Sequence, residues 1–555
     1  MTAVAAAAAL APARKPRHLA GTGALLRLAL RRDRVMIPAW VLVLGLAVAS
    51  MGASFEALYD TAAQRAELAA SMNANASLRA LYGPIFSDTI GGLVTWRMAG
   101  FGAVLAGVMS LLIVVRHTRE EEETGRQELL SAAMVGRRAP LTAALLTALI
   151  ANAALAVLIA GGLAKSGQPA AGSLALGVAI GGAGMFFAGL AAIAAQLTES
   201  ARLAKGLTGA VLGLAFALRA AGDAAASGPS GAGAGGASSP LVWISPIGWA
   251  ENLRAYADER WWVTLLFIAA TLLTVGAAYV LTARRDIGMS FLPARPGPAR
   301  APRSLSGPTG LAWRLQRTTL LGWTLGFLCA GAVFGGIAKG ASDLVGGNRQ
   351  TLEIVQRMGG QQGLTDAFLA TMTGMLGMVA AIYAAGSVLR LRSEETGDRA
   401  EPVLAGAVGR LRWACGHLAV AYLGTAVILG SGGLALGISY GITAHDVAGQ
   451  LGPVLGAALA QVPAVWTLTG VAVLVYGLLP KATTAVWAVV GGCLAIGWIG
   501  PSLKFPQWAM DLSPFSHLPK LPGAGTTAAP FLWLLGLSAL FMVAGLTGLR
   551  RRDMD

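Results

Sequence analysis

The sequence predicts an all-α polytopic membrane protein with about 12 transmembrane helices, arranged as two parallel six-helix repeats. Three observations lead to this fold class. The chain has 555 residues, of which 55% are hydrophobic and only 12% are charged. Apolar windows of about 20 residues, the length that crosses a hydrocarbon core, recur along it. Short motifs of the first half return in the same order in the second. Lipid is therefore the expected main solvent.

Six apolar windows lie in each half of the chain. Those of the first half are Val35 to Ala53, Leu93 to Val115, Pro140 to Leu163, Leu174 to Leu197, Gly206 to Leu218 and Trp261 to Leu281. Those of the second half are Thr318 to Ala338, Ala367 to Leu389, Trp413 to Ile438, Leu451 to Leu479, Ala482 to Ile499 and Phe531 to Leu549. The fifth window is the shortest of its half, and its limits are the least defined.

The positive charges predict the orientation of the chain. With a cytoplasmic N-terminus, about 30 of the Arg and Lys residues fall on the cytoplasmic side, as the positive-inside rule requires. Arginine clusters lie before the first span, after the sixth and at the chain end. An even number of spans returns the C-terminus to the same side. We therefore expect a multi-pass membrane protein with both termini in the cytoplasm, and the same clusters argue against a nucleic-acid partner.

Internal repetition predicts two halves that share one orientation. Glu122-Glu123-Thr124-Gly125 returns as Glu394-Glu395-Thr396-Gly397, and Val135-Gly136-Arg137 returns as Val408-Gly409-Arg410. Ser245-Pro246 returns as Ser513-Pro514, and Arg284-Arg285-Asp286 as Arg551-Arg552-Asp553. The pairs lie about 270 residues apart, which is a spacing of whole halves and not of short repeats.

Two stretches of low complexity indicate linkers. Residues 291 to 309 are rich in Pro, Arg and Ser, which predicts a cytoplasmic connection between the halves. The predicted organisation is a first half over 1–290 with an N-terminal interfacial helix near Leu25 to Arg34, a linker over 291–312 and a second half over 313–555. Trp313, Arg314 and Arg317 repeat the interfacial pattern more weakly. Residues 224 to 239 contain almost only Ala, Gly, Ser and Pro, and read as an outer loop.

The segments Arg116 to Arg138 and Arg390 to Arg412 follow the second and the eighth span. Each places carboxylates at the end of a span and then offers a glycine, Gly125 or Gly397, at which the chain can turn. Apolar residues follow at helical spacing. Solvated loops would explain the arginines, but acidic runs are unexpected where topology favours positive charge. A docking surface for a cytoplasmic partner explains them better.

In these loops, this span pattern and this duplication the chain resembles the permease subunits of bacterial ABC exporters, in particular the two-repeat branch of polyketide-antibiotic (tetronasin-type) exporters of actinobacteria. The resemblance covers nearly the whole chain. It implies that each loop forms a coupling helix on one of two copies of a separate ATP-binding cassette subunit, which carries ATP and Mg. The implied docking residues are Glu122, Glu123, Gly125, Arg126 and Glu128 in the first half, and Glu394, Glu395, Gly397, Asp398 and Glu401 in the second.

The expected substrate is a hydrophobic or amphipathic small molecule, held in an apolar cavity between the halves and moved outward by alternating access. Candidate aromatic contacts are Trp96, Tyr383, Trp466, Tyr476 and Trp487. Pro and aromatic residues at Trp243 to Trp249 and Leu512 to Phe515 predict short interfacial or re-entrant helices before the last span of each half, acting as gates or as anchors.

The sequence lacks the phosphate loop G-x-x-x-x-G-K-[ST], so ATP hydrolysis is expected on the partner and no catalytic site, cofactor or metal on this chain. His117 has only neighbouring Arg and Glu residues to explain it. Arg97 and Arg219 are expected to extend to the surface from span ends. Glu251, Asp258 and Glu259 are expected to be solvated.

Two rival functions are consistent with the same span pattern. An ion-coupled drug antiporter would satisfy the span count and the repeat, but it needs a carboxylate at depth, and the sequence offers no good one. A membrane-embedded lipid-modifying enzyme would need clustered acids, His or a metal site at an interface. A purely structural or receptor role leaves the duplicated loops unexplained. The sequence identifies neither the substrate nor the ATPase.

Overall fold

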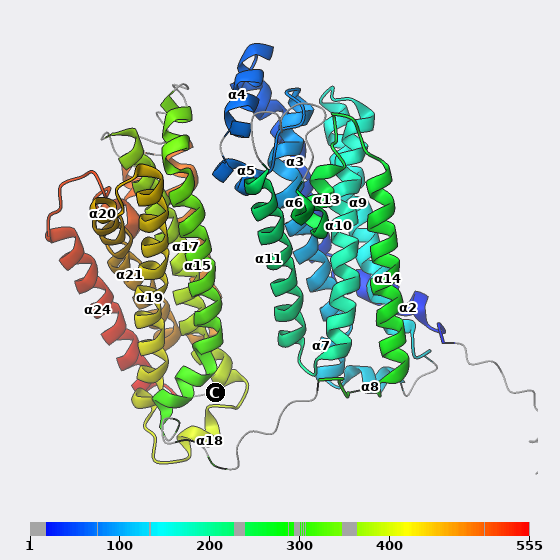
Figure 1. Ribbon diagram of the computed structural model, residues 1–555. Helices are drawn as coiled ribbons and strands as arrows, with labels where there is room; N and C mark the ends of the chain where they lie inside the picture. The colour runs from blue at the N-terminus through cyan, green and yellow to red at the C-terminus, as the bar shows by residue number, and fades with distance from the viewer. Residues whose placement is uncertain are drawn as a thin grey trace, which may run out of the picture. The chain divides into compact units, whose positions relative to one another are not determined.

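The computed structural model is all-helical over the part of the chain that it describes (Figure 1). These residues are 18–74, 76–131, 135–226, 239–286, 288–292, 300, 302, 305, 307–346, 363–503 and 506–553. The only extended pairing among them is an isolated bridge between Thr198 and Leu292. The chain divides into two compact units, Met1–Pro296 and Gly297–Asp555, called unit 1 and unit 2 below.

Unit 1 is a bundle of long helices with short helices at both ends (Figure 1). Its helices are α2 (Thr22–Arg32), α3 (Met36–Leu58), α4 (Ala62–Ala74), α5 (Ala76–Tyr82), α6 (Ile90–Arg116), α7 (Arg119–Glu123), α8 (Arg126–Ser131), α9 (Ala139–Lys165), α10 (Ala170–Leu197), α11 (Ala201–Ala225), α12 (Pro240–Ile244), α13 (Pro246–Asn252) and α14 (Trp262–Arg284). Two-thirds of the apolar windows of α6 and α10 are buried, against 22% for α14. The centre of the unit is therefore formed by α6 and α10.

Unit 2 has the same kind of architecture. Its elements are α15 (Pro308–Gly346), α17 (Leu364–Thr396), α18 (Glu401–Leu404), α19 (Arg410–Ala444), α20 (Val447–Leu459), α21 (Val462–Leu478), η3 (Pro480–Ala482), α22 (Ala485–Leu503), α23 (Gln507–Met510), η4 (Pro514–His517) and α24 (Ala529–Arg551). Here α17 and α21 are central, whereas only 17% of the window of α24 is buried.

Eleven helices within the described residues are long and apolar enough to cross a membrane. They correspond to the expected spans except the eleventh, at which α22 contributes a shorter apolar segment, Ala485–Gly497. The fifth span is longer than its apolar window, because α11 continues past Leu218 to Ala225. The tenth is interrupted between α20 and α21, just before Pro463, which lacks the N–H that a continuous helix needs.

Glycine contacts set the closest helix crossings. A Cβ atom on Gly477 of α21 would lie 1.9 Å from the carbonyl oxygen of Gly545 in α24, and one on Gly545 would lie 2.4 Å from that of Val473. Only residues without side chains allow these two backbones to approach so closely. The high glycine content of the chain thus has a packing function at this crossing.

Several expectations about the ends of the spans are corrected. Trp313, Arg314 and Arg317 belong to the same helix as the following span and form no separate interfacial helix, whereas Leu25 to Arg34 falls on the separate helix α2. Most of the low-complexity stretch 224–239 lies outside the described residues. Both Ser-Pro segments begin short helices, α13 and η4, as expected.

Arg219 does not extend to the surface, because its side chain is fully buried. Glu251 is buried as well and is not a solvated loop residue. His117 has a specific partner, since its Nε2 lies 2.6 Å from Oδ2 of the buried Asp33. These three corrections share one cause: each residue pairs with an opposite charge that is distant in the sequence.

Candidate functional site

The acidic run of unit 1 forms α7, just after the long helix α6, and a turn at Gly125 separates it from α8. Figure 1 labels these three helices. Gly125 has a φ angle of +71°, a left-handed conformation that glycine adopts without steric cost. Its N–H donates to the carbonyl oxygen of Glu122 over 3.0 Å. The turn brings α8 under the end of the bundle.

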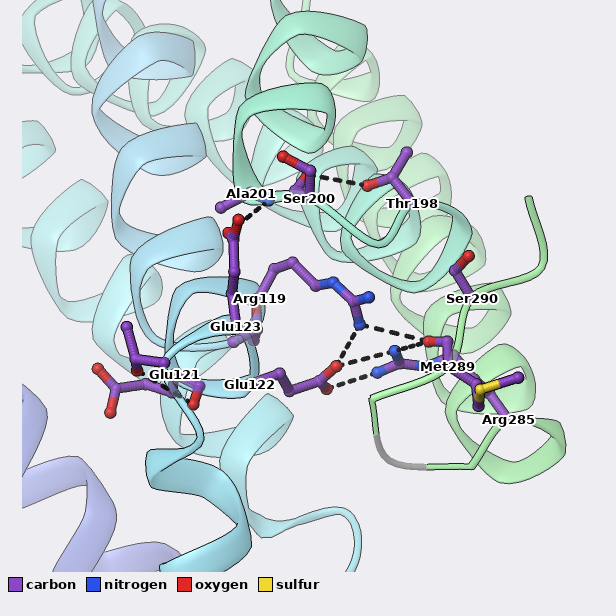
Figure 2. Close-up of polar contacts among 12 residues, drawn as sticks. Arg119, Glu121, Glu122, Glu123, Thr198, Ser200, Ala201, Arg285, Met289 and Ser290 are labelled. Atoms are coloured by element: carbon purple, nitrogen blue, oxygen red, sulfur yellow. Dashed lines mark hydrogen bonds and ion pairs between the residues drawn. The ribbon is translucent and has the colours of Figure 1, made fainter. Parts of the chain in front are cut away.

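Each of the four glutamates binds a different group. Glu120 pairs with Lys205 of α11, and Glu121 pairs with Arg32 of α2. Oε2 of Glu123 accepts a hydrogen bond of 3.1 Å from the backbone N–H of Ala201, at the positive end of α11 (Figure 2). The acidic run therefore ties the loop to neighbouring helices.

Glu122 makes the most enclosed of these contacts. Its carboxylate receives two hydrogen bonds from the guanidinium of Arg285, of 2.5 and 2.8 Å, and a further one from Arg119 (Figure 2). The three side chains are 2 to 6% exposed. Arg285 directly follows α14, so this carboxylate fastens the loop to the end of the last span of unit 1. Arg137 adds a hydrogen bond of 2.6 Å to the carbonyl oxygen of Arg285.

Unit 2 repeats this network. Glu395 receives hydrogen bonds of 2.6 and 2.9 Å from the guanidinium of Arg552, which directly follows the last span α24. Arg392 lies 3.4 Å from the same carboxylate, in the position that Arg119 has toward Glu122. Arg410 donates over 2.6 Å to the carbonyl oxygen of Arg552, as Arg137 does to that of Arg285. Burial alone would lower the pKa of Arg552, but Glu395 raises it above its ordinary value.

The contacts align the loops of the two units differently, by one residue, from the alignment of the repeated letters E-E-T-G in the sequence. When Arg119 is aligned with Arg392, Glu122 is aligned with Glu395, and not with Glu394. The same alignment pairs Gly125 with Asp398, whose φ angle of +55° is left-handed as well. The N–H of Asp398 donates to the carbonyl oxygen of Glu395, as the N–H of Gly125 donates to that of Glu122. Arg126 therefore corresponds to Arg399, and the match of the letters E-E-T-G is misleading.

The expected docking residues divide into a buried and an exposed group. The carboxylates of Glu122, Glu394 and Glu395 point into the bundle, where Glu394 pairs with Arg390 and Arg399. The side chains of these three are at most 9% exposed, so they offer little surface to a partner. Glu123 is exposed but also caps α11. Gly397, Asp398, Glu401, Arg126 and Glu128 are exposed, and Gly125 is half-buried with open space beside its Cα. The docking set expected from sequence omits Leu129, which is 77% exposed beside Glu128 on α8.

The five candidate substrate aromatics lie on several helices, Trp96 in unit 1 and the other four in unit 2. Trp96 donates to the carbonyl oxygen of Gly83, Tyr383 to that of Val420 and Trp466 to that of Tyr422. Tyr476 is buried with its ring 5.0 Å from the guanidinium carbon of Arg552, and so joins the network of unit 2. Trp487 is 45% exposed on α22. The first four thus have partners within their own units, and a contact of any of the five with substrate stays a prediction.

Within the described residues no group of three or more His, Cys, Asp or Glu side chains is placed to hold a metal ion. The cysteines Cys329, Cys415 and Cys493 are free. In each unit, ion pairs hold the acidic loop to the end of the last span. In the described part of the chain we find no group of side chains arranged as a catalytic centre.

Comparison with known proteins gives a relative that matches along nearly the whole chain and a family that matches the second half. The chain is 45% identical over 535 residues to the multidrug efflux system permease protein Rv1217c of Mycobacterium tuberculosis, covering 96% of this chain and 95% of that protein. Residues 305–550 match the family described as the C-terminal domain of the multidrug efflux system permease Rv1217c.

Proposed function

The chain belongs to the family of multidrug efflux system permeases, and from this premise we propose that it exports hydrophobic or amphipathic small molecules, driven by a separate ATPase that docks on the loops of both units. We also propose that the permease is of the ABC type and belongs to the two-repeat, tetronasin-type branch. It would lie in the bacterial cytoplasmic membrane with both termini in the cytoplasm. ATP and Mg would be bound by two copies of the partner subunit.

The observation that carries the proposal is the duplicated network behind the loops. In each unit one carboxylate joins the loop to the residue that follows the last span, Glu122 to Arg285 and Glu395 to Arg552. A charge pair of this kind, buried and doubly hydrogen-bonded, is a directional and stiff connection. A force applied to the loop would thus reach α14 in unit 1 and α24 in unit 2.

The exposed residues of the loops are the proposed contacts with the ATPase. In unit 1 they are Arg126, Glu128 and Leu129, and in unit 2 Asp398, Arg399 and Glu401. A side chain such as Leu129, 77% exposed at the end of the bundle among charged neighbours, is the type of anchor that fills a pocket on a partner. The two loops differ in charge, since Gly125 corresponds to Asp398, and we expect unequal contacts with the two ATPase copies.

In the proposed mechanism the ATPase subunits approach one another when they bind ATP and displace both loops. The carboxylates Glu122 and Glu395 transmit that displacement to the last spans, and the permease changes between two conformations that expose the substrate to opposite sides. Direction of transport follows from the efflux activity in the name of the relative. The chain itself contributes docking, transmission and the substrate path, and the sequence contains no phosphate loop.

The rival antiporter would work without an ATPase and with a proton gradient. Inside-out vesicles that carry the permease together with a candidate ATPase distinguish the two, with a fluorescent lipophilic dye as the probe. We expect dye uptake that requires ATP and survives an uncoupler. Uptake that needs no ATPase and collapses with the uncoupler would replace the proposal by the antiporter.

A pair of charge reversals tests the docking surface in the same vesicles. Arg126→Glu and Asp398→Arg change exposed side chains and leave the buried network intact, so both variants should insert normally. We expect ATP-driven uptake to fall about tenfold or more, the consequence of losing roughly 1.4 kcal/mol of coupling. The matched control is Lys165→Glu, an exposed basic residue in the last turn of α9, at the opposite end of unit 1. Equal losses in all three variants would argue against a docking surface.

A further inference from the structure

A second buried charge cluster lies in unit 1, at the end of α11 opposite the acidic loop. Nη1 of Arg219 is 3.0 Å from Oε1 of Glu251 and 3.4 Å from Oδ2 of Asp223. Its Nη2 donates to the carbonyl oxygens of Ala80 and Leu81. Arg219 is fully buried, and the two carboxyl groups are about 5% exposed. Two carboxyl groups thus share one nitrogen of one guanidinium.

The second oxygen of Glu251 has no donor. Oε2 is buried and lies in no hydrogen bond to any described residue, while Oε1 of Glu251 and Oδ2 of Asp223 approach the same nitrogen of Arg219. The backbone encloses this group, since a Cβ atom on Gly83 or on Gly100 would lie 2.9 Å from it. A carboxylate oxygen that is buried without a donor is costly, and a proton on it removes both the charge and the missing hydrogen bond.

Other charged groups around the cluster already have partners. Arg79 of α5 donates to the carbonyl oxygens of Asp223, Asn73 and Ala226.

Two further arginines of unit 1 lie over aromatic rings. Arg97 of α6 is 4.1 Å from the ring centre of Tyr82, and Arg254, after α13, is 4.3 Å from that of Phe86 and 3.5 Å from Oδ2 of Asp258. Burial raises the pKa of Glu251 well above its ordinary value; Arg219 opposes this rise and Asp223 adds to it.

We propose that Glu251 and Asp223 form a proton-binding site that holds one proton between them while this end of unit 1 is closed, and that loss of this proton favours its opening. Once both carboxyls are ionised, one guanidinium nitrogen faces two negative charges in a buried site, and separation or hydration of the pair relieves the repulsion. The closed form is therefore stabilised below the raised pKa and loses that stability as the pH rises through it.

The site belongs to unit 1 alone. The residue that follows Ser513 at the distance of Glu251 from Ser245 is Pro519, so unit 2 has no carboxyl at the corresponding position. In the predicted orientation this end faces outward, and the external pH would set the balance between closed and open forms. The proposal concerns the permease by itself and does not depend on an ATPase.

Infrared difference spectra of the purified permease in lipid nanodiscs test the site. We expect a protonated-carboxyl C=O band that persists above about pH 6, at which exposed carboxyl groups have ionised. Glu251→Gln should remove it, and Asp223→Asn should move its disappearance to lower pH, because Arg219 then serves Glu251 alone. Glu259→Gln, the same change nearby in the sequence, should leave it unchanged. A wild-type spectrum without the band, or a band that survives in Glu251→Gln, overturns the proposal.

A second measurement separates proton control from a merely structural ion pair. With one coupled proton, the ratio of closed to open forms changes by up to about tenfold per pH unit between the two pKa values. Fluorescence of a dye attached to a single cysteine at Ala257, in a cysteine-free background, reports the ratio. We expect a pH-dependent signal in the wild type and in Glu259→Gln, and a flat one in Glu251→Gln. A reduced melting temperature with an unchanged pH profile would show that the pair is structural only.

Discussion

Replacing Glu122 with glutamine removes one negative charge and keeps the shape of the side chain. In the native protein this carboxylate is the counter-charge of Arg285 and Arg119, all three of them at most 6% exposed. The substitution leaves two buried guanidinium groups that still donate to the carbonyl oxygen of Met289 but have lost the carboxylate that they share. Removing one partner of a buried ion pair costs about 3–5 kcal/mol, because the remaining charge is uncompensated.

The loss of stability caused by Glu122→Gln should lie at the lower end of that range. The loop is at the end of the bundle, and water can reach Arg285 after a small displacement, which reduces the penalty. We therefore expect Glu122→Gln to destabilise unit 1 by about 3 kcal/mol. Glu395→Gln should act in the same way on unit 2, since Glu395 and Arg552 repeat the geometry. The control is Glu401→Gln, an exposed side chain for which we expect a change below about 0.5 kcal/mol.

Thermal unfolding of the purified permease in detergent, without any ATPase, measures these differences. The double variant Glu122→Gln with Arg285→Gln should recover part of the loss, because it removes an uncompensated charge together with its partner. Equal melting temperatures for Glu122→Gln and Glu401→Gln would refute the reasoning. In that case the contacts of the acidic run would not contribute to stability.

Two further substitutions test the backbone at the loop and at the closest crossing. Gly125→Asp should cost about 1 kcal/mol, because a left-handed residue acquires a Cβ atom, whereas Asp398→Gly at the equivalent position should be neutral or stabilising. A difference of the opposite sign in melting temperature would contradict the correspondence between Gly125 and Asp398. Gly477→Ala should destabilise unit 2 by roughly 1–3 kcal/mol, since its Cβ would lie 1.9 Å from a backbone oxygen, whereas Gly536→Ala on the same helix pair has open space. Similar melting curves for these two variants would argue against the tight crossing.

The sequence predicts the helices well because hydropathy is a local property. Where the prediction is wrong, contacts between distant residues decide the outcome. Arg219 and Asp223 interrupt the apolar window of the fifth span and so predict an end at Leu218, yet α11 continues to Ala225 because both side chains are buried in a cluster with Glu251. No spacing in the sequence indicates that Glu251 lies beside them.

The loops show the same limit. The acidic run is conspicuous in the sequence, but its interpretation as a docking surface treats every glutamate as exposed. The structure turns Glu122 inward because Arg285, distant in the sequence, lies behind it. The one signal for this ion pair in the sequence is the repeat. An arginine follows the last span of each half, Arg285 and Arg552, and an acidic run is also present in each half, so the duplicated opposite charges predict a pair. The parallel arrangement of the halves stays a prediction.

Native mass spectrometry of the permease purified with its candidate ATPase tests the central claim most directly, because it counts the subunits. We predict one permease with two ATPase copies, and a shift toward complexes with fewer copies for Arg126→Glu or Asp398→Arg alone. A permease that carries no ATPase, or a complex with two copies that neither variant weakens, would contradict the account.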